Sequence, residues 1–195
     1  MKEIIDVATK EVIPFGIENL PALVHGVEGS GASFFSISLA VQLHLNKQKL
    51  IMFTAYPMAK EEFFAQIGEA KDSVFCLDSI EDIQKAEGFQ TIIVKSGDED
   101  LLTAFMEEFA NLLDYTLFIK NVENIKSHDV VEYAVSHLSI ISGDVSKSPF
   151  AEILVDGEYK TKVLLSTLGS DDCSGLEKYQ AKLITGSKEC IVSLR

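Results

Sequence analysis

The sequence predicts a three-layer α/β/α fold with a mostly parallel central sheet and antiparallel hairpins at its C-terminal end. Short apolar runs alternate with longer segments of helical spacing from residue 22 to residue 145. A glycine-rich turn, GVEGSGAS, joins the first apolar run to the first helix, and turn signals replace helical patterns in 150–195. Strands that alternate with helices form a mostly parallel sheet that is covered on both faces.

The first half of the chain is predicted to begin this alternation. The apolar run ALVHG (22–26) ends at a glycine, which is typical of a buried strand that enters a turn. Residues 33–48 are rich in apolar side chains and are long enough for a largely buried helix. KLIMFTAY (49–56) is the next strand, and a helix over 60–70 leads to a strand at SVFCLD (73–78). We expect ALVHG and KLIMFT to be central strands.

The middle of the chain continues the pattern. Ser79 is the predicted N-cap of a helix over 79–88, with Asp82 three residues on as in a capping box. FQTIIVKSG (89–97) is rich in β-branched residues and predicts a further central strand. The helix over 98–114 is the clearest, because acidic residues lead it and apolar residues follow at helical spacing. Further strands are predicted at 115–121 and 137–145, with a helix at about 127–136 between them.

Two hairpins are predicted at the C-terminal end. AEILVDGEYKTKVLLS (151–166) has Asp156-Gly157 at its turn, and YQAKLITGSKECIVSLR (179–195) turns at Thr185-Gly186-Ser187. The polar segment GSDDCSG (169–175) is a candidate linker between them.

The composition predicts a single folded domain over 1–195, with an N-terminal segment at 1–12 and a hairpin-rich edge at 150–195. Apolar residues make up 47% of the 195 residues, and no apolar run approaches the ~20 residues of a membrane span. The start, MKEIIDVATKEVIPFG, lacks the apolar core of a signal peptide. We therefore expect a cytoplasmic protein with no membrane contact.

The chain is strongly acidic, with a formal net charge of −13, and its 17 basic residues include a single arginine, Arg195. Acidic charge disfavours contact with phosphate backbones, so nucleic acid is not an expected partner. A protein that clamps phosphates, or lends an arginine to a neighbour, normally carries arginine inside its fold. Cys76, Cys173 and Cys190 have neither metal-ligand nor redox spacing and are expected to be reduced thiols.

The segment GVEGSGAS (26–33) has the spacing of a phosphate-binding loop, G-x-x-x-x-G-K-[ST]. The two glycines and the final serine are in place, but Ala32 stands where the lysine belongs, so the Walker A loop is degenerate. Backbone N–H groups in such a turn, with the positive end of the following helix, can hold phosphate without side chains. The candidate cofactor-binding residues of the loop are Gly26, Glu28, Gly29, Ser30, Gly31, Ala32 and Ser33.

The residues around the loop extend the likeness. IPFGIENLPALVHGVEGSGASFFSISLAVQLHLNKQKLIMFTA resembles the RecA-like ATPases, which include the archaeal recombinases and the KaiC-like proteins. Gly16-Ile17 with Leu20 matches their G-I-x-x-L segment, Gln42 the glutamine of their first helix, and residues 49–54 their next strand. The detailed likeness covers roughly residues 13–56, and beyond it the order of elements agrees. The resemblance implies a RecA-like domain that assembles with its nucleotide site between neighbours.

The resemblance also shows which groups of the ATP-hydrolysing members are absent. Ala32 supplies no charge to the β- and γ-phosphates, and Glu28 adds a negative charge inside the loop. The glutamate that activates water in those members ends the strand after the loop helix, where this chain reads FTAYPMA. The nearest acids, Glu61 and Glu62, are expected on the next helix. No catalytic residue is therefore predicted.

The strand that should end in a magnesium-binding aspartate ends in lysine in both candidates, Lys95 of TIIVKSG and Lys120 of TLFIKN. Either lysine could replace the missing loop charge, because the carboxyl ends of parallel strands form the ligand-binding rim of an open sheet. The alternative is a rim lysine paired with acids such as Asp98. Ser30 and Ser33 are either phosphate or magnesium ligands, or turn and helix-cap residues of an inactive loop.

The histidines predict no metal site. His25 directly precedes the loop and is expected to be structural, and His44, His128 and His137 form no ligand pattern.

Two functions from different classes follow. The first is a non-catalytic RecA-like protein, a pseudo-ATPase that acts as a scaffold or regulatory assembly subunit and that self-associates or binds a RecA-like partner. No cofactor is expected for it. The alternative is an atypical ATP-binding switch or weak ATPase that binds ATP or ADP weakly and uses Lys95 or Lys120 in place of the loop lysine. A role as a recombination or repair accessory is suggested by the resemblance alone and opposed by the acidity.

Overall fold

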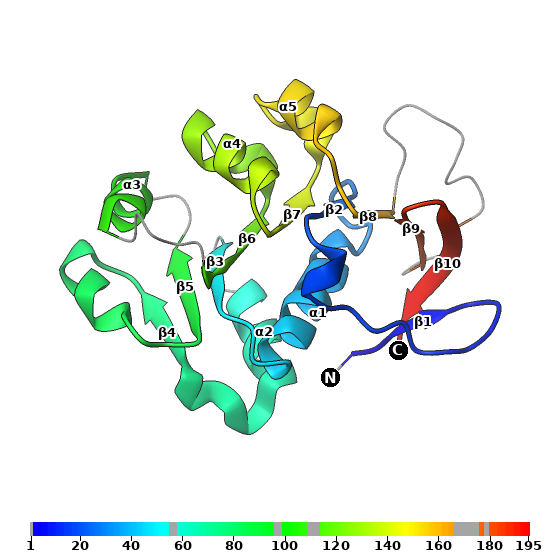
Figure 1. Cartoon of the computed structure of the whole chain (residues 1–195), viewed down its shortest axis with the longest axis horizontal. Helices are drawn as coiled ribbons and strands as arrows, with labels where there is room; N and C mark the ends of the chain where they lie inside the picture. The colour runs from blue at the N-terminus through cyan, green and yellow to red at the C-terminus, as the bar shows by residue number, and fades with distance from the viewer. Residues whose placement is uncertain (1, 55–57, 96–98, 109–113, 166–175, 178–179) are drawn as a thin grey trace.

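A computed structural model of the chain describes residues 2–54, 58–95, 99–108, 114–165, 176–177 and 180–195. These residues form one sheet of ten strands in the order β1-β10-β9-β8-β2-β7-β6-β3-β5-β4 (Figure 1). The neighbours from β8 to β4 pair in parallel, and those from β1 to β8 pair antiparallel. The predicted fold class, a mostly parallel α/β sheet with antiparallel C-terminal strands, is confirmed.

The predicted strands appear, except the first arm of the hairpin expected over 151–166, and one more strand is present. The apolar runs expected at the centre are β2, β3 and β5, and each has a paired strand on both sides. The additional strand is β1, whose three residues pair with β10. The strands are β1 (Ile4–Asp6), β2 (Ala22–His25), β3 (Leu50–Thr54), β4 (Val74–Leu77), β5 (Thr91–Lys95), β6 (Thr116–Lys120), β7 (Ser139–Gly143), β8 (Thr161–Leu164), β9 (Gln180–Thr185) and β10 (Lys188–Leu194).

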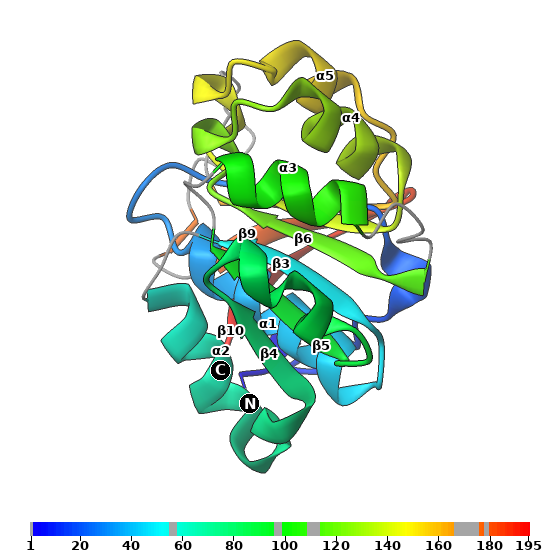
Figure 2. The ribbon, with the colours of Figure 1, turned by 90° about the vertical axis from the view of Figure 1, so that its left-hand side faces the viewer.

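Helices cover both faces of the parallel part of the sheet. Figure 2 shows α1 (Ala32–Leu45) and α2 (Met58–Ile67) on one face and α3 (Glu99–Glu108), α4 (His128–Ser136) and α5 (Ala151–Asp156) on the other. Residues 109–113 of the predicted 98–114 helix lie outside the described residues. Short 3-10 helices complete the connections, at Ile17–Asn19, Gly68–Ser73, Ile80–Ala86, Val122–Asn124 and Val145–Lys147. Within the described ranges, no helix has the length and apolarity needed to cross a membrane.

The helix α1 is enclosed because the sheet curls around it. Phe35, Leu39 and Leu43 of this helix are completely buried. Their apolar cluster includes side chains from α2 and also from the antiparallel strands, among them Ala181 and Val192. Figure 1 accordingly shows α1 between α2 and β10. A helix that is apolar on all sides is typical of a core position, and here the antiparallel strands provide the wall that α2 leaves open.

The strand β3 shows how one sequence serves both faces. Leu50 and Met52 belong to the apolar cluster around α1, whereas Ile51 and Phe53 belong to the cluster under α3, α4 and α5. Phe53 packs edge-on against Phe105 of α3, with ring centroids 6.2 Å apart. Successive side chains of a strand point to opposite faces, so a strand buried on both faces reads as a continuous apolar run.

The hairpin predicted over 151–166 is wrong. Its first arm is the helix α5, and its second arm contains β8, which pairs in parallel with β2. The helical turn buries Leu154 completely and leaves Val155 47% exposed, whereas a strand would place Ile153 and Val155 on one face. Tyr159 then donates a hydrogen bond from its hydroxyl to the Leu154 carbonyl at 2.9 Å. Asp156-Gly157 therefore ends a helix and does not form a hairpin turn.

Two other predictions can be compared directly. The hairpin predicted over 179–195 is confirmed as β9 and β10, with Thr185 opposite Lys188 across the turn. The helix predicted over 79–88 is a 3-10 helix, Ile80–Ala86, and Ser79 accepts its capping hydrogen bond from the Glu81 N–H at 3.3 Å.

A buried histidine anchors the C-terminal end of α1. The Nδ1 of His44 lies 2.8 Å from the Thr91 hydroxyl, and its Nε2 lies 3.3 Å from the Ser73 hydroxyl. Ser73 donates its own proton to the Ala70 carbonyl, so it can accept from Nε2–H while Thr91 donates to Nδ1. Burial lowers the pKa of His44, and the charge of Lys47 lowers it further. The histidine is therefore a neutral structural group.

This lowered pKa predicts a specific pH dependence of stability. An unfolded histidine takes up its proton near pH 6.5, whereas the folded His44 takes it up only at lower pH. Its contribution to stability is therefore complete above pH 6.5 and is lost as the pH falls below it, by at most about 1.4 kcal/mol per pH unit. Urea unfolding of wild type and His44→Gln at pH 7.5, 6.5 and 5.5 should show the wild-type advantage shrinking with acidity. A difference that stays constant with pH would contradict the neutral assignment.

Candidate functional site

A tight turn carries the chain from the end of β2 into α1. The helix begins at Ala32, and its N-cap is Gly31 with φ +96°, a left-handed conformation that side chains disfavour. Gly29 also has positive φ, at +81°. The Ser30 N–H bonds to the Val27 carbonyl at 3.0 Å and closes the turn. The glycines are thus required by the path of the backbone.

Gly26 has no room for a side chain. A Cβ on Gly26 would lie 2.3 Å from the Ser30 Oγ and 3.0 Å from the Ala32 Cβ. The backbone N–H of Gly26 donates a hydrogen bond to the Gly143 carbonyl of β7 at 3.3 Å. The Ser30 hydroxyl is packed beneath the turn, and it has no hydrogen-bond partner among the described residues. Neither serine is the helix cap that one interpretation expected, because Gly31 holds that position without a side-chain hydrogen bond.

The turn forms one wall of an open pocket of about 780 Å³. The opposite wall comes from the carboxyl ends of β6 and β7 and the residues that follow them. The first turn of α1 and one face of α2 complete it. The pocket is lined by Gly26, Val27, Glu28, Gly29, Gly31, Ala32, Ser33, Phe34, Ile37, Ala59, Glu62, Lys120, Asn121, Glu123, Asn124, Ser142, Gly143, Asp144 and Lys147.

The structure brings most of the sequence-predicted site residues together, with Lys95 as the exception. Six of the seven loop candidates line the pocket, and the seventh, Ser30, lies beneath it. Lys120, at the end of β6, lines the facing wall. Lys95 ends β5, which β3 separates from β6, and it is not among the residues that line the pocket. Asp98, its suggested partner, lies outside the described residues.

Lys120 is a half-buried lysine held by a neutral group. Its ammonium donates a hydrogen bond to the side-chain oxygen of Asn121, which itself has left-handed backbone at φ +59°. Burial lowers the pKa of Lys120, and the nearby charge of Glu123 opposes that shift. Among the described residues, no carboxylate oxygen lies within 4.0 Å of its ammonium.

Two acids at the strand ends were not singled out from the sequence. Asp144 follows β7, and its carboxylate accepts a hydrogen bond from the Ser146 hydroxyl and lies 3.4 Å from the Lys147 ammonium. These contacts hold the pKa of Asp144 below its usual value. Glu123 accepts a hydrogen bond from the Asp144 N–H at 3.1 Å. Their position after parallel strands was the available signal, because ligands bind at that edge of an open sheet.

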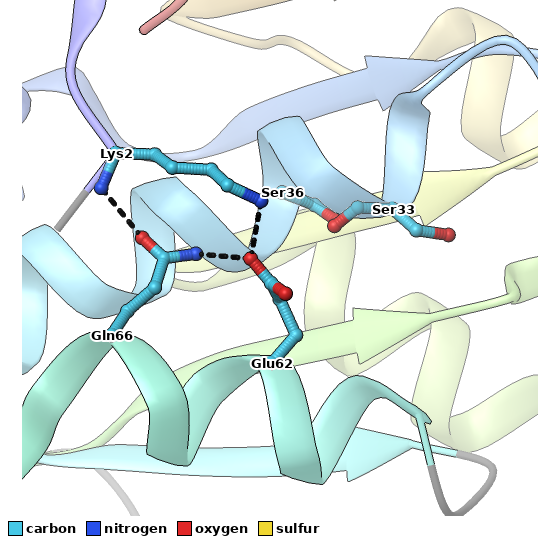
Figure 3. Close-up of polar contacts among 5 residues, drawn as sticks. All are labelled: Lys2, Ser33, Ser36, Glu62 and Gln66. Carbon is cyan, nitrogen blue, oxygen red and sulfur yellow. Dashed lines mark hydrogen bonds and ion pairs between the residues drawn. The ribbon is translucent and has the colours of Figure 1, made fainter.

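A third missed contact comes from the start of the chain. The ammonium of Lys2 lies 2.6 Å from Glu62 Oε1, and Gln66 donates to the same oxygen at 2.9 Å (Figure 3). The Lys2 N–H bonds to the Gln66 side-chain oxygen, and its ammonium lies 4.3 Å from the ring centroid of Phe34. Glu62, expected merely on the next helix, therefore lines the pocket with its charge neutralised. No sequence spacing could have indicated this pair, because sixty residues separate its members.

The pocket carries charged groups of both signs. Its lining includes the carboxylates of Glu28, Glu62, Glu123 and Asp144 and the ammonium groups of Lys120 and Lys147. Lys2 forms an ion pair with Glu62, and Lys147 forms one with Asp144. The groups without an ion pair in the described chain are thus two carboxylates and Lys120. A P-loop ATPase instead surrounds its phosphates with a lysine and magnesium.

His25, like His44, has a structural role. His25 is buried at the end of β2, and its Nδ1 accepts a hydrogen bond from the Val145 N–H at 3.3 Å. Burial lowers the pKa of His25 against the opposing charge of Asp144, so the ring is neutral. In the described chain, His128, Asp129 and Glu132 form the sole group with metal-ligand spacing. All three are exposed on α4, and an exposed acidic group of this kind does not define a site.

The comparisons with known proteins agree with this geometry at the level of the fold. No family model matches the sequence, and no curated protein matches it either. The structure resembles the genome packaging NTPase B204 from Sulfolobus turreted icosahedral virus 2 in complex with AMP, with a TM-score of 0.59 at 13% identity over 88% of this chain and 95% of that chain. A complex of the same NTPase with sulfate gives 0.58 at 14% identity, over 88% of this chain and 94% of that one.

A third solved structure, described as an ATPase, gives a TM-score of 0.56 at 11% identity and covers 98% of this chain and 85% of that chain. Identities this low show the fold alone. The chain therefore has a P-loop NTPase-like α/β fold.

The loop geometry predicts how its missing charge can be restored. Ala32→Lys places an ammonium at the first residue of α1 beside the pocket, so it should strengthen Mg-ATP binding by about tenfold. Glu28→Gly removes a negative charge that repels the phosphate, so the double variant Glu28→Gly with Ala32→Lys should bind more tightly than either single variant. Calorimetric titration of all four proteins measures this, with Lys95→Gln as the control outside the pocket. Folded variants that bind no better than wild type would show that the loop N–H groups do not face a phosphate site.

Proposed function

We propose that this chain is a non-catalytic member of the RecA-like P-loop proteins, a pseudo-ATPase that works in the cytoplasm as a scaffold or regulatory assembly subunit. The observation that carries the proposal is that a lysine, and not a carboxylate, ends β6. Lys120 stands on the pocket wall where a magnesium-binding carboxylate is needed, and Ala32 leaves the loop without its lysine. Phosphoryl transfer depends on positioning and charge neutralisation, and each lost group typically costs several kcal/mol of transition-state stabilisation.

The acids that remain at the pocket support the loss of hydrolysis. Glu62 of α2 lines the pocket, but Lys2 and Gln66 both contact its Oε1. A carboxylate neutralised in this way is a poor base for water. Asp144 is likewise engaged by Ser146 and Lys147.

The core is preserved although the catalytic groups are not, and this supports a structural role. The RecA-like proteins assemble through the face that holds the nucleotide, and members without hydrolysis serve as subunits. The turn exposes Val27, which is 44% exposed, beside the open pocket. We therefore propose a second copy of this chain or a RecA-like protein as the partner.

One observation favours a second candidate, an ATP-binding switch or weak ATPase. Lys120 lines the pocket and has a neutral hydrogen-bond partner, so it can supply the charge that Ala32 lacks. The geometry gives no such support to Lys95. The scaffold and the switch differ in one respect: ATP binding should change the assembly of a switch and should not change that of a scaffold.

We expect no hydrolysis of Mg-ATP above background. The reason is the combined absence of the loop lysine, replaced by Ala32, and of a carboxylate at the last residue of β6, where Lys120 stands. Release of inorganic phosphate from the purified chain measures this, with Gly31→Asp, which blocks the turn, as the control for a contaminating enzyme. Turnover of ~1 s⁻¹ or more that Gly31→Asp abolishes would refute the proposal.

We also expect the chain to self-associate or to bind a RecA-like partner. Sedimentation velocity over a hundredfold range of concentration tests the first, and affinity capture from the host tests the second. Val27→Asp on the exposed turn should weaken the association, whereas Val155→Asp on α5, exposed to a similar extent, is the matched control. A monomer at every concentration with no captured RecA-like protein would leave the assembly role without support.

A further inference from the structure

The charge environment of Lys120 points to a particular kind of ligand. Three lysines lie at or beside the pocket, and two of them contact a carboxylate. Lys2 lies 2.6 Å from Glu62 and Lys147 lies 3.4 Å from Asp144. Lys120, in the described chain, has an amide oxygen as its partner and no carboxylate within 4.0 Å.

A half-buried ammonium that contacts no carboxylate is an unfavourable arrangement, and the charge of Glu123 offsets this cost only in part. Removal from water destabilises the charged form, which agrees with the direction of the Lys120 pKa shift. An anion in the pocket would stabilise the charged form of Lys120. The facing wall is formed by the turn and by the N-terminal end of α1, whose positive dipole end favours an anion; the N–H groups of Gly26, Ser30 and Phe34 already have backbone partners.

The same ammonium disfavours a divalent metal. Magnesium in a P-loop site needs a carboxylate at a strand end, and here that strand end carries a positive charge. The acids that follow β6 and β7 have other contacts, since Glu123 accepts the Asp144 N–H and Asp144 contacts Ser146 and Lys147. Like charges a few ångströms apart repel strongly where water is scarce.

We propose that the pocket binds a diphosphate group as the metal-free anion, held between the loop N–H groups and Lys120, which takes the electrostatic role of both the loop lysine and the magnesium ion. This inference rests on the proposed loss of hydrolysis, because a site without magnesium can retain a diphosphate but cannot transfer its phosphoryl group by the usual route. The bound anion then serves as a structural ligand that joins the loop to the end of β6.

The test is calorimetric titration of the full chain with inorganic pyrophosphate and, separately, with ADP, each in EDTA and in excess magnesium chloride. We expect binding in EDTA, and magnesium should leave the affinity unchanged or weaken it. Lys120→Gln should weaken binding by about tenfold or more, and Lys120→Arg, which keeps the charge, should retain most of it. Lys95→Gln is the matched control at a strand end outside the pocket and should bind like wild type.

The two ligands separate the possible sources of the diphosphate. Equal affinity would show that the diphosphate alone is recognised, and tighter binding of ADP would show that a nucleotide is the natural source; both support the proposal. Binding that requires magnesium, equal binding by Lys120→Gln, or no binding of either ligand in EDTA would overturn it. The magnesium comparison uses wild type alone, so it decides the matter even if a variant fails to fold. Absence of binding without ATP turnover would refute this inference and leave the proposed loss of hydrolysis intact.

Discussion

The backbone turn from β2 into α1 forms one wall of the pocket and sets the start of α1. Gly26 lies against the Ser30 hydroxyl and the Ala32 methyl, and Gly31 in left-handed conformation starts the helix. This turn is held from both sides. The Gly26 N–H bonds to β7, and α1 is locked by apolar contacts with α2 and with the antiparallel strands. The shape of the turn therefore follows from the packing of the core.

The curled sheet has a consequence for the site as well as for stability. The strand β1, which extends the antiparallel edge, brings the start of the chain alongside α2, so that Lys2 reaches Glu62 at the pocket. The contact neutralises an acid that would otherwise repel an anion. A partly exposed ion pair contributes little to stability, about 0–1 kcal/mol, so its main effect is on the charge of the pocket.

Much of the fold could be predicted from sequence, because alternation of apolar runs with helical segments fixes the order of elements. The loop could be located because glycine spacing and its strand–turn–helix context coincide. The helix α5 could not be predicted, because Asp156-Gly157 suits a hairpin turn and a helix end equally well. The burial of Leu154 decides between the two. Within the site, choosing Lys120 over Lys95 required the strand order, since β3 lies between β5 and β6. The pair Lys2–Glu62 depends entirely on tertiary contact.

The central claim is that the positive charge of this pocket comes from Lys120 and not from a metal ion. A crystal structure of the chain soaked with pyrophosphate and manganese chloride, with anomalous data collected at the manganese edge, tests it most directly. The account predicts pyrophosphate density between the Gly26–Gly31 turn and the Lys120 ammonium, with no anomalous peak in the pocket. A manganese peak ligated by Glu123 or Asp144, with Lys120 turned away from the anion, would contradict it.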